Sequence, residues 1–167
     1  MEDYIIRRAC RGDEQILAYI QTESWKVAFK GILPDEDLIR CTNIEKATAM
    51  YKGLLEQNKG NGYILEISGK PHAIAYWDKT READMDGFAE LICIHSLWDN
   101  WGKGYGSRLM NKVLDDIYSA GYRKVMLWVF DENMRARRFY EAKGFKKSAM
   151  QKENRGAVEV MYIKENL

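Results

Sequence analysis

Three glycines at alternate positions suggest an anion site that is built from the protein backbone. Gly102, Gly104 and Gly106 stand in the segment WGKGYGSRLM, which turns directly into a helix-forming pattern. The first N–H groups of a helix have no partner within it, and the helix dipole adds partial positive charge there. Because glycine has no Cβ atom, a phosphate group can approach such a backbone closely. The segment therefore predicts phosphate binding without a catalytic side chain.

The same spacing excludes two common phosphate-binding loops. A Walker A loop requires the pattern GxxxxGK followed by Ser or Thr, which this segment does not contain. The dinucleotide fingerprint GxGxxG opens a βαβ unit and has an acidic residue about 20 positions later. The pattern here is GxGxG, and it follows a predicted antiparallel hairpin. A turn that binds nothing is the alternative to an anion site.

Glu90 is the second candidate, because it is a carboxylate inside the nearly all-apolar segment FAELICIHSL. Burial of an unpaired carboxylate is strongly unfavourable, so such a residue is paired, stands at a strand end or has a function. Desolvation would raise its pKa toward the working range of a general base. His95 in the same segment is a rival base, although a single histidine in a strand more often packs.

The cysteines and histidines predict neither a metal site nor a disulfide framework. Cys10, Cys41 and Cys93 are odd in number and widely spaced, no CxxC pair occurs, and only His72 and His95 could join them. Cys93 has no activating partner in the sequence, so packing explains it better than a nucleophilic role. We therefore expect reduced thiols and a cytoplasmic protein.

Length and composition predict one domain that spans residues 1–167. Apolar residues make up 46% and charged residues 31% of the chain, which is ordinary for a globular protein. The net charge of +1 gives no electrostatic sign of a nucleic-acid partner. No apolar run approaches the roughly 20 residues of a membrane span, and the segment MEDYIIRRAC lacks the apolar stretch of a signal peptide. We therefore expect neither a nucleic acid nor a membrane as a partner.

Hydrophobic periodicity predicts the elements that position these residues. The fold class is α/β (α+β), with a mixed sheet in the order β–α–α–β–β–β–α–β–α–β–β, and the second helical stretch breaks in two at Thr42 or Asn43. The expected elements are a strand at 3–9, helices at 12–31 and 34–60, a hairpin at 63–69 and 72–79, a strand at 88–97, a helix at 104–120, a strand at 123–130, a helix at 132–144, and an antiparallel pair at 145–150 and 157–165.

The segment LWDNWGKGYGSRLM resembles motif A of the GNAT superfamily of acyl-CoA-dependent N-acyltransferases. The usual form of that motif is Gln/Arg-x-x-Gly-x-Gly/Ala, and Gly104 and Gly106 match its glycines. Trp101 stands where Gln or Arg is expected, which puts one side-chain contact to the pyrophosphate in doubt. The backbone contacts, which carry most of the anion binding, do not depend on that side chain.

A second segment, LWVFDENMRARRFYEAKGF, resembles motif B of the same family through Asn133, Ala136, the run Phe139-Tyr140-Glu141 and the pair Gly144-Phe145. The resemblance covers residues from about 60 to 164. It implies a central sheet that splays between strands 88–96 and 123–130, with helices on both faces and acetyl-CoA as the cosubstrate between those strands. The cofactor contacts that it implies are Ile94, His95, Ser96, Trp101, Gly102, Lys103, Gly104, Tyr105, Gly106, Ser107, Asn133 and Phe139.

The resemblance also implies the roles of the catalytic residues. Tyr140 matches the tyrosine that commonly protonates the sulfur of CoA, and a phenol pKa near 10 is close to the roughly 8.5 of a thiol. Glu90 has the spacing of the general base in histone-acetylating members, eleven residues before Trp101. Many members use water chains instead, so the base stays open. The amine must lose its proton and then attack directly, without a covalent acyl-enzyme.

The acceptor is a primary amine of a small molecule or peptide, and its class stays open. Trp25, Phe29 and Tyr76 could form an apolar or cation-binding wall, although Trp25 and Phe29 are one helical turn apart and could equally be core. The mixed charges do not separate a polyamine, an aminoglycoside, a peptide N-terminus or an amino acid. The alternative to an enzyme is a non-catalytic acyl-CoA-binding sensor or regulatory module, and a homodimer through the C-terminal strands is also left open.

Overall fold

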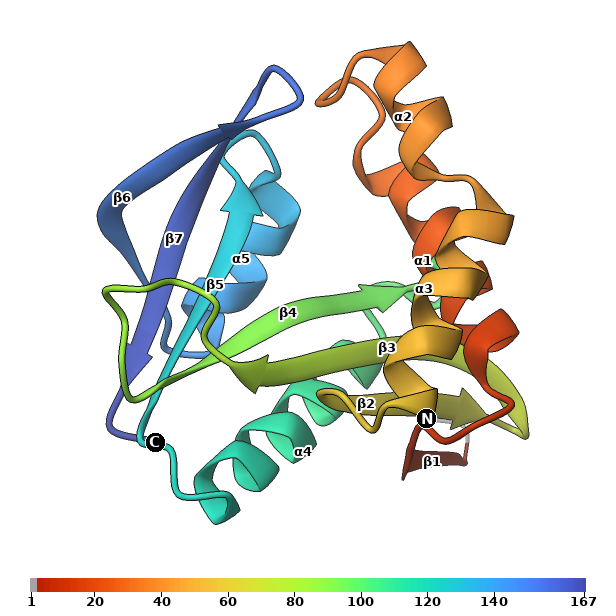
Figure 1. The fold of residues 1–167 in the computed structure, drawn as a ribbon, viewed down its shortest axis with the longest axis horizontal. Helices are drawn as coiled ribbons and strands as arrows, with labels where there is room; N and C mark the ends of the chain where they lie inside the picture. Colours follow the sequence, from red (N-terminus) through yellow and green to blue (C-terminus); the bar gives the residue numbers. More distant parts are fainter. Residues whose placement is uncertain (1–2) are drawn as a thin grey trace.

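Seven strands form one mixed sheet in the computed structural model, which describes residues 3–167 (Figure 1). The strand order is β1-β2-β3-β4-β5-β7-β6, and only the β4–β5 pair is parallel. The strands are β1 (Tyr4–Arg8), β2 (Asn61–Ile67), β3 (Lys70–Lys79), β4 (Phe88–Ser96), β5 (Lys124–Phe130), β6 (Lys146–Asn154) and β7 (Ala157–Glu165).

In the described residues, five α-helices and one short 3₁₀-helix connect the strands. They are α1 (Glu14–Ala28), α2 (Asp35–Cys41), α3 (Ile44–Glu56), η1 (Trp98–Asn100), α4 (Tyr105–Ser119) and α5 (Met134–Ala142). The predicted break within 34–60 is present, because the Asn43 side chain accepts a hydrogen bond from the Lys46 N–H at 2.8 Å and so starts α3. Strand β6 runs four residues further than the predicted 145–150, past an irregularity between Lys147 and Gln151.

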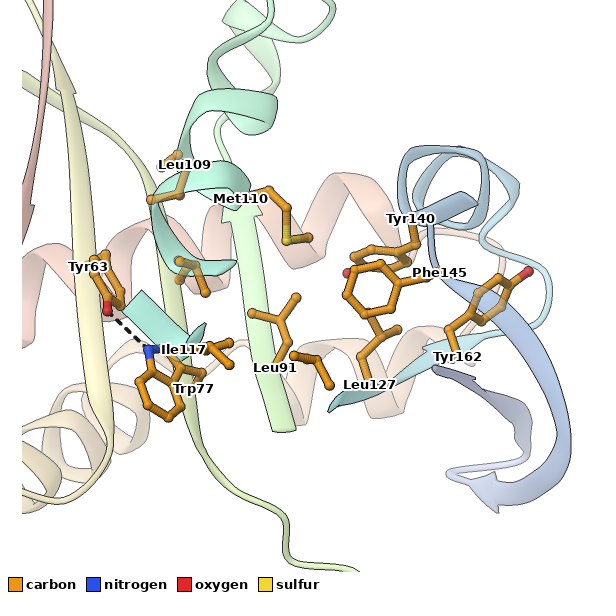
Figure 2. Packing of buried hydrophobic residues seen from close by; sticks show 14 of the residues in the cluster. Tyr63, Trp77, Leu91, Leu109, Met110, Ile117, Leu127, Tyr140, Phe145 and Tyr162 are labelled. Atoms are coloured by element: carbon orange, nitrogen blue, oxygen red, sulfur yellow. Dashed lines mark hydrogen bonds between the residues drawn. The ribbon is translucent and has the colours of Figure 1, made fainter. Parts of the chain in front are cut away.

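The helices cover both faces of the sheet, as predicted. On one face, Leu17 and Ile20 of α1 and Tyr51 of α3 pack on Ile64 and Ile74 of the sheet. On the other face, α4 buries a stripe that recurs every four residues and α5 adds Tyr140 (Figure 2). The residues of that stripe are Leu109, Val113 and Ile117.

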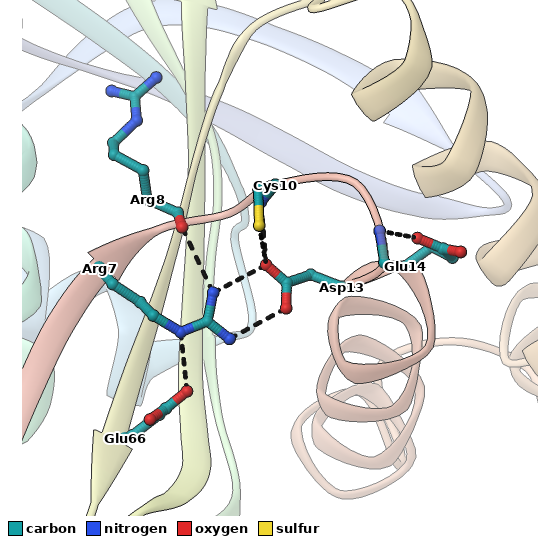
Figure 3. A network of polar contacts seen from close by, with 7 residues as sticks. Arg7, Arg8, Cys10, Asp13, Glu14 and Glu66 are labelled. Carbon is teal, nitrogen blue, oxygen red and sulfur yellow. Dashed lines mark hydrogen bonds and ion pairs between the residues drawn. The ribbon is translucent and has the colours of Figure 1, made fainter.

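A polar network joins the first strand to the first helix (Figure 3). The Arg7 guanidinium donates to both carboxylate oxygens of Asp13, at 2.8 and 2.9 Å, and to Glu66 of β2 at 2.8 Å. The N–H of Cys10 also donates to Asp13 at 2.9 Å. These bonds fix where α1 leaves β1 and therefore how α1 lies on the sheet. Within residues 3–167, no helix is both long enough and apolar enough to cross a membrane.

Candidate active site

The sheet opens between β4 and β5. Their pairing is limited to Phe88–Glu90 of β4 and Lys124–Met126 of β5, and beyond it the strands diverge (Figure 1). Ile92 has no opposite residue on β3, because Tyr76 pairs with Cys93 and Trp77 with Leu91. Such a β-bulge bends its strand and increases the local twist. The bulge therefore turns β4 away from β5 and leaves part of its backbone edge without a strand partner.

A cavity of about 1280 Å³ lies in this opening between the strands. Most of the side chains and glycines that the sequence predicts for the site line this cavity, although they come from α1, β3, β4, α4 and α5. Glu90 and Lys103 are not among the lining residues. The predicted residues that line it are Trp25, Phe29, Tyr76, Ile94, His95, Ser96, Trp101, Gly102, Gly104, Tyr105, Gly106, Ser107, Asn133, Phe139 and Tyr140.

The glycine loop at the start of α4 fits a phosphate group. Gly102 and Gly104 have φ angles of +79° and +86°, which side-chain-bearing residues rarely adopt. No side chain caps the first turn of α4, and a Cβ atom built on Gly102 would stand in open space. A Cβ atom on Gly106 would lie 3.7 Å from the Phe139 ring, so α5 packs closely against this turn. The loop thus offers N–H groups and room for an anion.

Tyr140 lies where α5 meets the core and is only 8% exposed. Its ring packs edge-on to Phe145, and its hydroxyl points away from Tyr162 (Figure 2). Within residues 3–167 this hydroxyl makes no hydrogen bond. Burial raises the pKa of Tyr140 well above its usual 10, so the predicted near match with a thiol pKa is wrong. The hydroxyl stays protonated and is a hydrogen-bond donor.

Glu90 is buried, but it is paired. The Arg81 guanidinium donates to its two oxygens at 2.6 and 3.1 Å, and the Arg81 backbone N–H donates at 3.0 Å. Burial alone would raise the pKa of Glu90, yet the hydrogen bonds from Arg81 outweigh it and the pKa is lowered. The predicted rise is therefore wrong, because the sequence did not reveal that the loop after β3 brings a cation to this strand.

An aromatic wall lies on the α1 side of the cavity. The Trp25 ring packs 5.3 Å from Phe29, and Phe29 packs 5.0 Å from Phe130 of β5. The Trp25 indole N–H donates to Nε2 of His95 at 2.9 Å, and burial lowers the pKa of His95 to about 4. His95 is therefore neutral, with one ring nitrogen occupied. Tyr76, in contrast, is only 4% exposed and belongs mainly to the core.

Three predicted cofactor contacts have further partners. Asn133 accepts a hydrogen bond from the Ala136 N–H at 3.2 Å and so caps α5. The exposed Lys103, which does not line the cavity, donates to the side chain of Asn100, which does, at 2.6 Å. The Trp101 indole N–H donates to the Ser96 carbonyl at 3.1 Å. Each of these contacts stabilises the loop or helix that lines the cavity.

The sequence interpretation missed the residue that lies on Trp101. The guanidinium carbon of Arg135 is 3.3 Å from the centroid of the Trp101 ring, and Arg135 lines the cavity. The sequence did contain a sign of this residue, because Arg135 stands two residues after Asn133, in the first turn of a helix. A cation there is opposed by the helix dipole and requires an explanation.

A splayed parallel pair, a glycine-led helix and a cavity between them are the architecture that the sequence resemblance implies. The sequence matches the family model described as the acetyltransferase (GNAT) family over residues 22–145. This chain therefore belongs to the GNAT family of N-acetyltransferases, and both the predicted family and the predicted fold class are confirmed.

Relatives and solved structures agree with this membership. An uncharacterized N-acetyltransferase of Methanocaldococcus jannaschii is 30% identical over 105 residues, which are 61% of this chain and 46% of that protein. The PaiA N-acetyltransferase from Thermoplasma acidophilum, solved in complex with coenzyme A, has a TM-score of 0.83 at 16% identity and covers 98% of this chain and 99% of its own. The yncA protein from Salmonella typhimurium, solved with its cofactor acetyl-CoA, has a TM-score of 0.72 at 19% identity and covers 97% and 93%.

Proposed function

We propose that this protein transfers the acetyl group of acetyl-CoA to a primary amine. The observation that carries the proposal is the Tyr140 hydroxyl, which has no hydrogen-bond partner within residues 3–167 and belongs to a residue that lines the cavity between β4 and β5. The same cavity reaches the glycine loop of α4. A donor for a leaving group and a site for an anion thus share one cavity, and solved structures with this fold hold coenzyme A or acetyl-CoA.

The chain offers two kinds of contact to acetyl-CoA. The N–H groups of the Gly102–Ser107 turn suit the pyrophosphate, because they carry partial positive charge and no side chain caps them. The backbone of β4 at Ile94, His95 and Ser96 suits the amide groups of the pantetheine arm, which would pair with it as an added strand does. Phe139 lines the same cavity and packs against Gly106 of this turn.

Acetyl-CoA supplies a thioester carbonyl that a neutral amine attacks directly. We assign to the Tyr140 hydroxyl the donation of a hydrogen bond, and then of its proton, to the departing sulfur. Because burial raises the pKa of Tyr140 further above that of a thiol, full transfer of the proton to the sulfur is uphill, and the hydrogen bond to the developing thiolate is the larger contribution. The Tyr140 hydroxyl therefore keeps its proton throughout the neutral pH range. It can donate a hydrogen bond there and does not act as a base.

The amine must also lose a proton, and neither of the two bases that the sequence predicts is free for this step. His95 has a pKa of about 4 and accepts a hydrogen bond from Trp25. Both oxygens of Glu90 accept hydrogen bonds from Arg81. We infer that water in the cavity takes the proton, and the predicted role of Glu90 as general base stays a prediction that the experiment below decides.

We assign the acceptor amine to the aromatic end of the cavity. Trp25 and Phe29 are half-buried there, and aromatic rings attract cations and cover apolar chains. Asp78 and Glu159 also line the cavity, as do Arg81 and Arg155, so both signs of charge are near. This environment fits an amine with an apolar or aromatic body better than one with many positive charges.

The decisive test is release of free thiol from acetyl-CoA in the presence of a panel of amines. Aryl-alkyl amines, amino acids, a peptide N-terminus, a polyamine and an aminoglycoside cover the open classes. Turnover with any of them supports the proposal, and the order of kcat/KM identifies the class. If no amine turns over while acetyl-CoA still raises the Tm, the protein is an acyl-CoA-binding module and the proposal fails.

A further inference from the structure

In the motif, a Gln or Arg at the position of Trp101 supplies a side-chain hydrogen-bond donor. Trp101 does not supply this donor to the cavity. Its only donor, the indole N–H, is used by the Ser96 carbonyl at 3.1 Å. That bond ties the loop before α4 to the end of β4. What Trp101 can still offer is its ring face, and a ring face binds cations rather than anions.

Arg135 occupies that ring face. Its guanidinium carbon lies 3.3 Å from the centroid of the Trp101 ring, and both residues line the cavity together with Gly102 and Gly104. Within residues 3–167, no carboxylate pairs with Arg135 and no acceptor takes a hydrogen bond from it. Arg137, two residues later, is different, because it donates to the Tyr162 hydroxyl and to Asp131.

Both the stacking of Arg135 and its place in α5 indicate that an anion completes this arrangement. A guanidinium that stacks through its face keeps the N–H groups of its edge free, and that planar edge matches two oxygens of a phosphate. Arg135 also stands in the first turn of α5, directly after the cap Asn133, where the helix dipole disfavours a cation. A bound anion between the starts of α4 and α5 would remove this conflict.

We propose that Arg135, held flat on Trp101, supplies the side-chain cation for the pyrophosphate of coenzyme A, in place of the Gln or Arg of the motif. The proposal rests on the proposed function, since it assumes the same cosubstrate. It assigns Trp101 the role of a platform. The side-chain donor is thus supplied by the first turn of α5 instead of by the loop before α4.

The test is the Kd of coenzyme A, measured by calorimetry on the full chain without an acceptor. Arg135→Ala should weaken binding by about tenfold to a hundredfold, which is the usual effect of losing a charge-assisted hydrogen bond. Arg138→Ala is the matched control, because Arg138 is an exposed arginine of α5 outside the cavity lining. Its Kd should equal that of the wild type.

A second ligand distinguishes a contact to the pyrophosphate from a contact to the 3′-phosphate of the cosubstrate. Dephospho-coenzyme A keeps the pyrophosphate and lacks the 3′-phosphate, so Arg135→Ala should weaken its binding by the same factor. A loss seen only with coenzyme A would overturn the pyrophosphate assignment. An unchanged Kd for both ligands would overturn the proposal entirely. A wild-type protein that binds neither ligand would overturn the proposed function itself, which is a different outcome.

The role of Trp101 has its own readout. Trp101→Leu removes the platform, so it should weaken binding nearly as much as Arg135→Ala, and the double variant should be no weaker than Arg135→Ala alone. Trp101→Phe keeps a ring and should bind within a few-fold of the wild type. Additive losses in the double variant would overturn the platform role, since the two residues would then act independently. An unchanged midpoint of thermal unfolding verifies that each variant is folded.

Discussion

At Tyr140 the same burial that fixes the side chain also changes its chemistry. The ring is held by Phe145 and Tyr162, and removal from water raises the pKa of the phenol well above 10. An ionised phenolate is thereby excluded at neutral pH. The residue can only donate, and a donor at a developing thiolate lowers the barrier for its departure.

Tyr140→Phe is expected to lower kcat by about 10² to 10⁴-fold, with little change in the Kd of acetyl-CoA. The ring and its packing are kept, so only the hydroxyl is lost. Steady-state kinetics together with calorimetry measure both quantities. Tyr118→Phe is the matched control, since Tyr118 is an exposed tyrosine of α4. An unchanged kcat in Tyr140→Phe would rule out the assigned donor.

The variant Glu90→Gln distinguishes two roles of Glu90, that of a general base and that of an ion-pair partner of Arg81. The hydrogen bonds between Glu90 and Arg81 predict a loss of about 1 to 2 kcal/mol in the free energy of unfolding, with the rising limb of the pH–rate profile retained. Arg81 is 66% exposed and can be solvated when its partner is removed, which limits the loss. Denaturant unfolding and a pH–rate profile measure the two effects. Loss of the rising limb without destabilisation would instead establish Glu90 as the base.

Arg81→Met is the complementary change, because it leaves the carboxylate buried without its cation. The pKa of Glu90 should then rise, since burial is opposed only by the backbone N–H of residue 81 and by Lys152 once the guanidinium is gone. The variant should be destabilised more than Glu90→Gln at pH 7, and the difference from wild type should shrink as the pH falls and Glu90 takes up a proton. A pH-independent difference in the free energy of unfolding would contradict this account.

At the scale of elements, the link between β1 and α1 depends on one buried carboxylate. Asp13 accepts hydrogen bonds from Arg7 and from the Cys10 N–H, and these lower its pKa (Figure 3). Because the pKa is lower in the folded state, this contribution to stability is present above the ordinary pKa of about 3.9 and is lost as the pH falls further. The start of α1 should therefore loosen first under acid.

Asp13→Asn keeps the size of the side chain and removes its charge. We expect a loss of about 2 kcal/mol in the free energy of unfolding at pH 7, since hydrogen bonds to a charged group are replaced by weaker ones. The loss should become smaller below about pH 3.9, where Asp13 of the unfolded wild-type chain takes up a proton, and should disappear only below the lowered pKa of the folded state. Urea unfolding at several pH values measures this. A difference that does not depend on pH would exclude the carboxylate charge as the cause.

At the scale of the whole molecule, the sheet is joined across its middle by only three paired residues on each of β4 and β5. Helices α1 and α3 cover one face and α4 covers the other, so the opening between the strands persists beside a packed core. A ligand that pairs with the free edge of β4 and contacts α5 would connect the two halves.

Coenzyme A should therefore raise the thermal stability of the protein. At a free concentration one hundred times its Kd, linkage gives about 2.7 kcal/mol, which corresponds to a rise in Tm of roughly 5 to 10 °C for a chain of this size. Differential scanning calorimetry at increasing concentrations measures the rise. A Tm that does not change with concentration would exclude binding to the folded state.

The strands, the helices and the glycine loop could be predicted because their signals are local. Alternation, four-residue spacing, the cap at Asn43 and the three glycines each act over a few residues. The contacts of Arg81 with Glu90 and of Arg135 with Trp101 could not be predicted, because they join different segments whose relative orientation depends on packing. The bulge at Ile92 likewise depends on the register between β3 and β4.

The sequence by itself determined the family and the order of the elements, and it predicted an anion site of backbone N–H groups at the glycine loop, since all three follow from short motifs and periodicity. Only the tertiary structure decided the protonation of the site. It raised the pKa of Tyr140 by burial, lowered that of Glu90 by pairing and kept His95 neutral. The physical reason is that a pKa depends on the charges and the solvent within a few ångströms of a group, and distant segments of the chain supply both.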